Sequence, residues 1–222
     1  MPPLTSTASG PGPLLKPRLR GVLHQWAFVV SLAAGTGLLL EAGSARARIA
    51  VAIYGLSTAA LFGTSALYHR IQWRTLAARR WMRRLDHTMI FVLIAGTYTP
   101  FALLVLHGTL GTAILIAVWS AALAGAVFKL LWIDAPGWLT ATSYIAIGWI
   151  VVVAAPQLLG HLGVVAVAVL ALGGLIYSVG ALIYATKRPD PFPAVFGYHE
   201  VFHLLVLIAA ALQYAVVAFW VL

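Results

Sequence analysis

The chain has 222 residues, of which 62% are hydrophobic and 9% are charged. A soluble domain is usually about 45–50% apolar and about 25% charged, so this composition excludes an ordinary water-soluble fold and indicates a chain surrounded mostly by lipid. Cysteine is absent, which excludes disulfides and thiolate ligands and leaves histidine and carboxylate for any transition-metal site.

The N-terminal end differs in composition from the rest of the chain. Its first fifteen residues are rich in Pro, Ser, Thr and Gly, which is typical of disordered segments. We therefore expect a disordered tail over residues 1–17 and one membrane domain over residues 18–222. The first apolar run is long enough to span, and no cleavage-like site follows a short core, so it is predicted to be a membrane helix rather than a signal peptide.

Seven apolar runs have the roughly 20 residues that a membrane-spanning helix needs. They are Val22–Leu40, Ile49–Tyr68, Leu85–Leu106, Thr109–Trp132, Trp138–Pro156, Leu162–Tyr184 and Glu200–Leu222. The fold predicted from them is an all-α bundle of seven transmembrane helices. Within the third run, we expect Gly96, Tyr98 and Pro100 to set close packing and a kink rather than to carry chemistry.

The basic residues indicate how this bundle is oriented. Cytoplasmic loops carry an excess of Lys and Arg, and a cytoplasmic N-terminus places 12 of the 14 basic residues inside. The inside residues are Lys16, Arg18, Arg20, Arg70, Arg74, Arg79, Arg80, Arg83, Arg84, Lys129, Lys187 and Arg188. The prediction is a cytoplasmic N-terminus and an outside C-terminus, in the inner (plasma) membrane. This placement also explains the net charge of +9 without a nucleic-acid partner.

The basic segment 70–84 also contains apolar residues, including Trp73 and Trp81. Two readings remain open for it. It can lie on the inner leaflet as a short amphipathic stretch, or form a solvated loop with interfacial tryptophans.

Ionisable residues inside a membrane are rare and usually face the bundle interior. Five of the seven histidines fall near the predicted cytoplasmic ends of helices, together with Asp86 and Glu200; His107 and His161 fall at the outer ends. The five inner histidines are His24, His69, His87, His199 and His203. The sequence therefore predicts a polar cluster at one level of the membrane.

His199 and His203 form the motif H-E-V-F-H. Residues four apart share a helix face, so both imidazoles can reach one ion. The motif is similar to the H-E-x-x-H of metalloproteases, but here it starts a membrane helix. Glu200 is therefore better explained as a first-turn acid favoured by the helix dipole than as a general base.

A metal ion held by His199 and His203 needs a third ligand at the same depth in the membrane. His69 ends the second predicted helix, and Ser65 lies four residues earlier on the same face. Three histidines with an open fourth position make a catalytic type of zinc site, in which Asp86 and Ser65 can hold water or orient a ligand. Asp86 can instead cap the third helix. His24 is a candidate for a supporting contact, whereas His87, about 100° around the helix from Asp86, is expected to point away.

Four motifs resemble the bacterial hemolysin III-like branch of the progestin and adipoQ receptor family, within the superfamily that includes the alkaline ceramidases. They are R-G-V-L-H at residues 20–24, S-A-L-Y-H at 65–69, L-D-H-T-M-I-F-V-L-I-A-G-T-Y-T-P-F at 85–101 and H-E-V-F-H at 199–203. The resemblance runs from about Arg18 to the C-terminus and implies the same seven-helix bundle with a cytoplasmic N-terminus.

The resemblance also implies roles for single residues. His69, His199 and His203 would be zinc ligands, Asp86 the partner of the zinc-bound water, and Ser65 a supporting or oxyanion-stabilising residue. The implied activity is hydrolysis of a lipid amide or ester, such as a ceramide-like substrate that enters from the bilayer. Two alternatives stay open: a receptor or membrane-homeostasis protein with structural zinc, and a hemolysin-type pore. The sequence does not indicate the oligomeric state.

Overall fold

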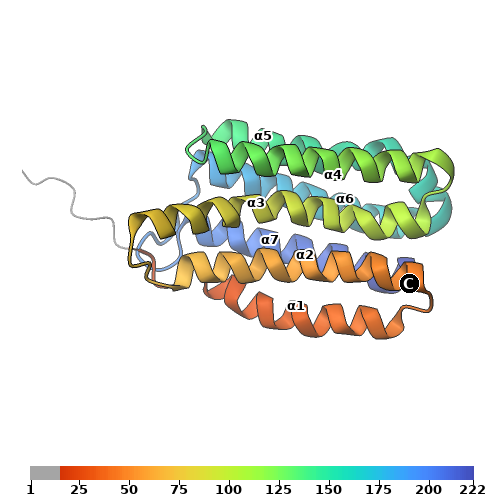
Figure 1. The fold of residues 1–222 in the computed structure, drawn as a ribbon, viewed down its shortest axis with the longest axis horizontal. Helices are drawn as coiled ribbons and strands as arrows, with labels where there is room; N and C mark the ends of the chain where they lie inside the picture. Colours follow the sequence, from red (N-terminus) through yellow and green to blue (C-terminus); the bar gives the residue numbers. More distant parts are fainter. Residues whose placement is uncertain (1–15) are drawn as a thin grey trace, which may run out of the picture.

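The computed structural model describes residues 16–222, which form a bundle of roughly aligned helices (Figure 1). The expected tail over 1–17 lies outside the described residues except for Lys16 and Pro17. The helices, in order, are α1 (Val22–Glu41), α2 (Ala45–Arg70), α3 (Leu76–Pro100), η1 (Phe101–Val105), α4 (Gly108–Leu131), α5 (Gly137–Gly148), η2 (Trp149–Ala154), α6 (Ala155–Thr186), α7 (Tyr198–Val216) and η3 (Val217–Val221).

Six helices of the described chain are long and apolar enough to cross a membrane. This number is one lower than the seven apolar runs, because α5, η2 and α6 follow one another without a break and count as one segment, Gly137–Thr186. The segment is not straight. Gly163 has a non-helical backbone, with φ 79° and ψ 171°, and Gly137 lies beside the backbone of Ala185.

The start of α3 differs most from the predicted boundaries. The helix begins at Leu76, nine residues before the predicted Leu85, and the Thr75 side chain caps it by accepting a hydrogen bond from Ala78 N at 3.1 Å. Asp86 therefore lies inside α3, so the alternative that it caps the helix is wrong. Most of the basic segment 70–84 is helical, and Arg80 and Arg83 pair with Asp134 at 3.0 and 2.7 Å.

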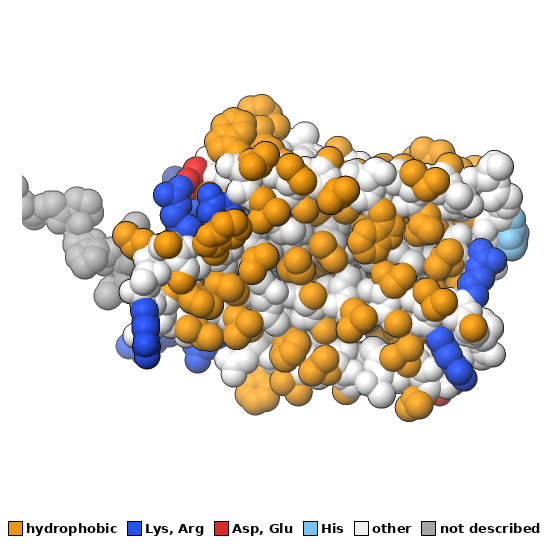
Figure 2. Space-filling model, viewed as in Figure 1, with side chains coloured by type: hydrophobic (Ala, Val, Ile, Leu, Met, Phe, Trp, Pro, Cys, Tyr) orange, Lys and Arg blue, Asp and Glu red, His pale blue; other side chains and the backbone are white. Residues whose placement is uncertain are grey.

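The surface has the distribution expected in a bilayer. Hydrophobic side chains cover the length of the bundle, and Lys and Arg side chains gather at its two ends (Figure 2). Exposed apolar residues such as Val30, Leu56 and Leu123 lie along these sides. This arrangement leaves the buried polar side chains as the unusual feature of the molecule.

Close packing of α2 on α3 depends on a small residue at Gly96. A Cβ atom built there would collide with the side chain of Ser57 on α2, as the expected close-packing role of Gly96 requires. The helix then continues past Pro100 as the π-helical turn Phe101–Val105. The contact matters for the site because α2 carries His69 and α3 carries Asp86.

We predict that Gly96→Ala lowers the free energy of unfolding by about 1–3 kcal/mol, because overpacking forces the two helices apart. Thermal unfolding of detergent-purified protein measures this. Gly160→Ala is the matched control, because a Cβ atom at Gly160 meets nothing within 4 Å. Equal melting temperatures for the two variants would contradict the packing account.

Candidate metal centre

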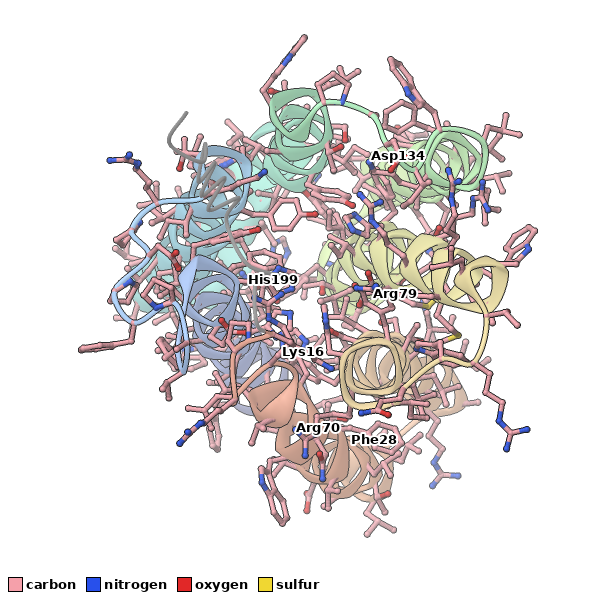
Figure 3. The ribbon with its side chains drawn as sticks, turned by 90° about the vertical axis from the view of Figure 1, so that its left-hand side faces the viewer. Lys16, Phe28, Arg70, Arg79, Asp134 and His199 are labelled. Atoms are coloured by element: carbon pink, nitrogen blue, oxygen red, sulfur yellow. The ribbon has the colours of Figure 1, made fainter. Side chains whose placement is uncertain are left out.

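Three buried histidines meet at one end of the bundle, contributed by the last turn of α2 and the first two turns of α7. His69 lies one residue before the end of α2, and His199 and His203 lie one turn apart near the start of α7. Seen from this end, His199 lies on the inner side of α7 (Figure 3).

The geometry of the three imidazoles suits a metal ion. His69 Nε2 and His199 Nε2 are 3.1 Å apart, and one ring nitrogen from each histidine lies within 4.8 Å of the others. Tetrahedral zinc with Zn–N bonds of about 2.0–2.1 Å separates its ligand atoms by about 3.3 Å. In addition, His203 Nδ1 is buried and has no hydrogen-bond partner among the described residues. The three histidines can therefore hold a metal ion.

His24 lies directly against these histidines, as its candidate supporting role requires. Its ring stacks on the ring of His203, with centroids 3.7 Å apart and planes inclined by 13°. Its Nδ1 is 2.8 Å from Ser65 Oγ. The stack fixes the orientation of His203, and the hydrogen bond joins α1 to α2 next to the predicted ligands.

Asp86 approaches the cluster from α3. Its Oδ2 lies 3.7 Å from His69 Nε2, beyond a direct hydrogen bond. Asp86, Ser65, His199 and His203 border one small cavity of about 30 Å³. A water needs about 10–15 Å³ of such volume, so the cavity leaves room for water between the carboxylate and the histidines.

His87 also borders this small cavity, so the expectation that it points away is wrong. Its Nε2 lies 3.3 Å from the hydroxyl of Tyr184, and its carbonyl accepts a hydrogen bond from the Tyr144 hydroxyl at 3.1 Å. The prediction was wrong because the cavity is wider than one helix face. Asp86 and His87, about 100° apart on α3, can therefore both border it.

The two tyrosines, Tyr144 and Tyr184, were not singled out from the sequence. Both border the small cavity, and the ring of Tyr184 lies 5.7 Å from that of His199. Tyr184 ends the sixth predicted helix on the side predicted to be cytoplasmic, at the level of the histidines. Because Tyr184 lies at the same predicted depth as the histidines, the sequence could have identified it as a site residue.

A second, larger cavity adjoins the small one. It has a volume of about 140 Å³ and extends among α3, α5, α6 and α7. The walls shared by the two cavities are Leu61, Ile90, Tyr144, Ala181, Phe202 and Val206. A mostly apolar chamber therefore lies next to the polar cluster.

Glu200 is engaged elsewhere. Its Oε2 accepts a hydrogen bond from Gly197 N at 2.8 Å, as in a capping box, and its other oxygen pairs with Arg20. The location of Glu200 in the first turn of α7 explains why an acidic residue occurs there. The Glu200 carboxylate is occupied by structural partners rather than directed at a substrate.

Sequence comparison with known proteins identifies the family of this chain. The family model described as "Haemolysin-III related" matches residues 13–214. The chain is 35% identical over 202 residues to "Hemolysin-3 homolog" of Bacillus subtilis (strain 168), which covers 90% of this chain and 91% of the relative. It is 34% identical over 204 residues to "Hemolysin-3" of Bacillus cereus, with 90% of each chain covered.

A more distant similarity reaches an animal protein. "Adiponectin receptor protein" of Drosophila melanogaster is 24% identical over 188 residues, covering 68% of this chain and 38% of the relative. These matches agree with the resemblance to the progestin and adipoQ receptor family. With six helices able to span a membrane, they identify a multi-pass protein of the plasma membrane. The chain belongs to the haemolysin-III related family.

Proposed function

We propose that this protein is a zinc-dependent hydrolase that cleaves lipid amides or esters, ceramide-like substrates among them, at the inner leaflet. One observation carries the proposal: His199, His203 and Asp86 border a small cavity that adjoins a larger apolar one, and His69 lies within metal-binding reach of both histidines. The first cavity suits a hydrolytic reaction, and the second suits an acyl chain.

The donor set favours zinc. The chain has no cysteine, and all-imidazole ligation suits zinc among the common metals. Three histidine ligands with an open fourth position are typical of catalytic zinc. When bound, zinc lowers the pKa of water toward about 7 and polarises a substrate carbonyl.

Asp86 is assigned the proton transfers of the reaction. Its carboxylate accepts the proton that the attacking water loses as the water oxygen bonds to the carbonyl carbon. When the C–N or C–O bond then breaks, Asp86 returns this proton to the departing amine or alcohol. Its place in α3, across the small cavity from His199 and His203, suits both transfers.

Ser65 is assigned the stabilisation of the substrate's carbonyl oxygen. If His24 carries its proton on Nδ1, the ring donates to Ser65 Oγ across 2.8 Å. The serine hydroxyl hydrogen can then donate at the small cavity, to the Asp86 carboxylate before substrate binds and to the substrate's carbonyl oxygen once it is present. His24 supports the reaction by orienting this hydroxyl.

The lining of the apolar cavity supports the proposal that the substrate is a lipid. Its lining consists mainly of aliphatic and aromatic side chains such as Ile94, Phe101 and Trp149. An engineered apolar cavity of about 150 Å³ binds a benzene-sized group, so the space holds part of an acyl chain without rearrangement.

We also propose that the chain crosses the membrane seven times, with the N-terminus inside and the C-terminus outside. A straight helix over Gly137–Thr186 would be about 75 Å long, against a hydrocarbon core of about 30 Å. The adjacency of Gly137 and Ala185 instead supports the proposal of two passes joined near Gly163. The unequal distribution of Lys and Arg supports the orientation.

Cysteine labelling tests this topology, because the natural chain has no cysteine. We expect Gly43→Cys and Leu222→Cys to react with a membrane-impermeant maleimide in intact cells, and Gln72→Cys to react only after permeabilisation. All three positions are exposed in the structure. Protection of Leu222→Cys in intact cells would exclude the odd number of passes.

A second candidate function is a receptor or homeostasis protein with structural metal. The observation that favours it is that the histidines join α2 to α7, so a metal there would hold two helices together. The names of the hemolysin relatives raise a pore as well. However, the buried ionisable side chains of the described residues gather at one end of the bundle rather than along a helix.

Zinc-dependent release of free fatty acid from a panel of ceramides and other acyl lipids tests the hydrolase proposal. We expect Asp86→Asn to reduce turnover by about 10²- to 10⁴-fold, because it removes the base. His161→Ala is the control, since that histidine is exposed near the opposite end.

The contrary outcome is equally clear. If chelation lowers the melting temperature but no lipid in a broad panel is hydrolysed, the structural-metal function replaces the hydrolase. Conductance in planar bilayers would instead favour the pore.

A further inference from the structure

Residues 16–21, here called the N-terminal clamp, run beside the metal centre at the end of the bundle. Arg18 N donates a hydrogen bond to Ala194 O, and Leu19 N donates to Val195 O, each at 3.1 Å. These bonds hold the clamp against the connection between α6 and α7.

The clamp also contacts the last turn of α2. The Lys16 ammonium donates a hydrogen bond to the backbone carbonyl of His69, in the last turn, where helix carbonyls lack intrahelical partners. Gly21 has a φ of 81° and lies so close that an added Cβ would be 2.5 Å from the Cβ of His69. The clamp therefore holds His69, one of the predicted ligands, through contacts with its backbone carbonyl and its Cβ atom.

The other two ligands are held through Glu200. This residue lies between His199 and His203 in sequence and is almost fully buried, with 1% of its surface exposed. Its carboxylate joins Arg20 of the clamp to Gly197 N at the start of α7. The first turn of α7 is thereby fixed to the segment that also holds His69.

We propose that the N-terminal clamp positions the metal ligands, and that Arg20 is the positioning residue, acting through Glu200. The clamp holds the end of α2 and the start of α7 in one register, so that all three imidazoles reach a single ion. The clamp leads directly into α1, which packs against both α2 and α7. This inference rests on the metal site proposed above.

Zinc affinity of the full-length protein, measured by competition with a chromogenic chelator, tests the inference. We expect Arg20→Met to weaken zinc binding by about 10- to 100-fold, the usual effect of losing a residue that orients metal ligands. Arg80→Met is the matched control, because Arg80 pairs with Asp134 on an exposed surface. Its zinc affinity should equal that of the natural protein.

A double variant separates positioning from folding. Arg20→Met alone leaves the Glu200 carboxylate buried without its cation, which destabilises the fold. Adding Glu200→Gln removes that charge and keeps an oxygen for Gly197 N. We expect the double variant to regain the thermal stability of the natural protein. Its zinc affinity should stay low, and the visible spectrum of its cobalt form should still differ from that of the natural protein. Full recovery of affinity would overturn the positioning role.

Hydrogen exchange of the metal-free proteins tests the clamp without a bound ion. Amides in the first two turns of α7 should exchange faster in Arg20→Met and in the double variant than in the natural protein or Arg80→Met. Unchanged exchange would overturn the inference. If the natural protein binds no zinc, the proposed function fails, and this exchange comparison alone decides whether the clamp fixes α7.

Discussion

The cost of placing ionisable side chains among lipid-facing helices is the constraint on which this structure depends. Such groups are expensive in a bilayer unless they face the interior and find partners. In this protein they converge: His69, His199 and His203 lie together, with His24 stacked on one of them. Because imidazoles so close together cannot all carry charge cheaply, a shared metal ion is the simplest partner that satisfies them.

The rest of the bundle supports this convergence. The close approach of α2 and α3 at Gly96 sets the separation between the helices that carry His69 and Asp86. The N-terminal clamp joins the ends of α2 and α7. Next to the polar cluster, a less tightly packed region among α3, α5, α6 and α7 leaves the apolar cavity. Tight packing and open space therefore lie side by side, as the proposed lipid substrate would require.

Much of this arrangement could be predicted from the sequence because the membrane restricts the alternatives. Length and apolarity located the helices, and H-E-V-F-H placed two histidines on one face. The helical reach of α3 was missed because Leu76–Arg84 is too polar for a membrane span, although Thr75 offered a cap. The sequence did not show that the helical residues continue from Gly137 to Thr186 through the non-helical Gly163, because an apolar run does not reveal whether the backbone turns or only kinks between two helices.

The sequence predicted how deep in the membrane the site residues lie, but not which way their side chains point. Depth grouped His24, Asp86 and Glu200 with the three histidines, but it could not show that Glu200 pairs with Arg20. Nor could it show that His87 and Tyr184 share the small cavity with Asp86. Side-chain direction depends on how the helices rotate about their axes, and packing across the whole bundle sets that rotation.

Elemental analysis of detergent-purified protein shows whether His69, His199 and His203 bind one zinc ion. We predict about one zinc per chain, lost when all three histidines are replaced by alanine. Zinc should be retained when His107 and His161, whose rings pair 4.6 Å apart, are replaced instead. Well-folded natural protein without zinc, or equal zinc in both variants, would rule out a zinc site made by these three histidines.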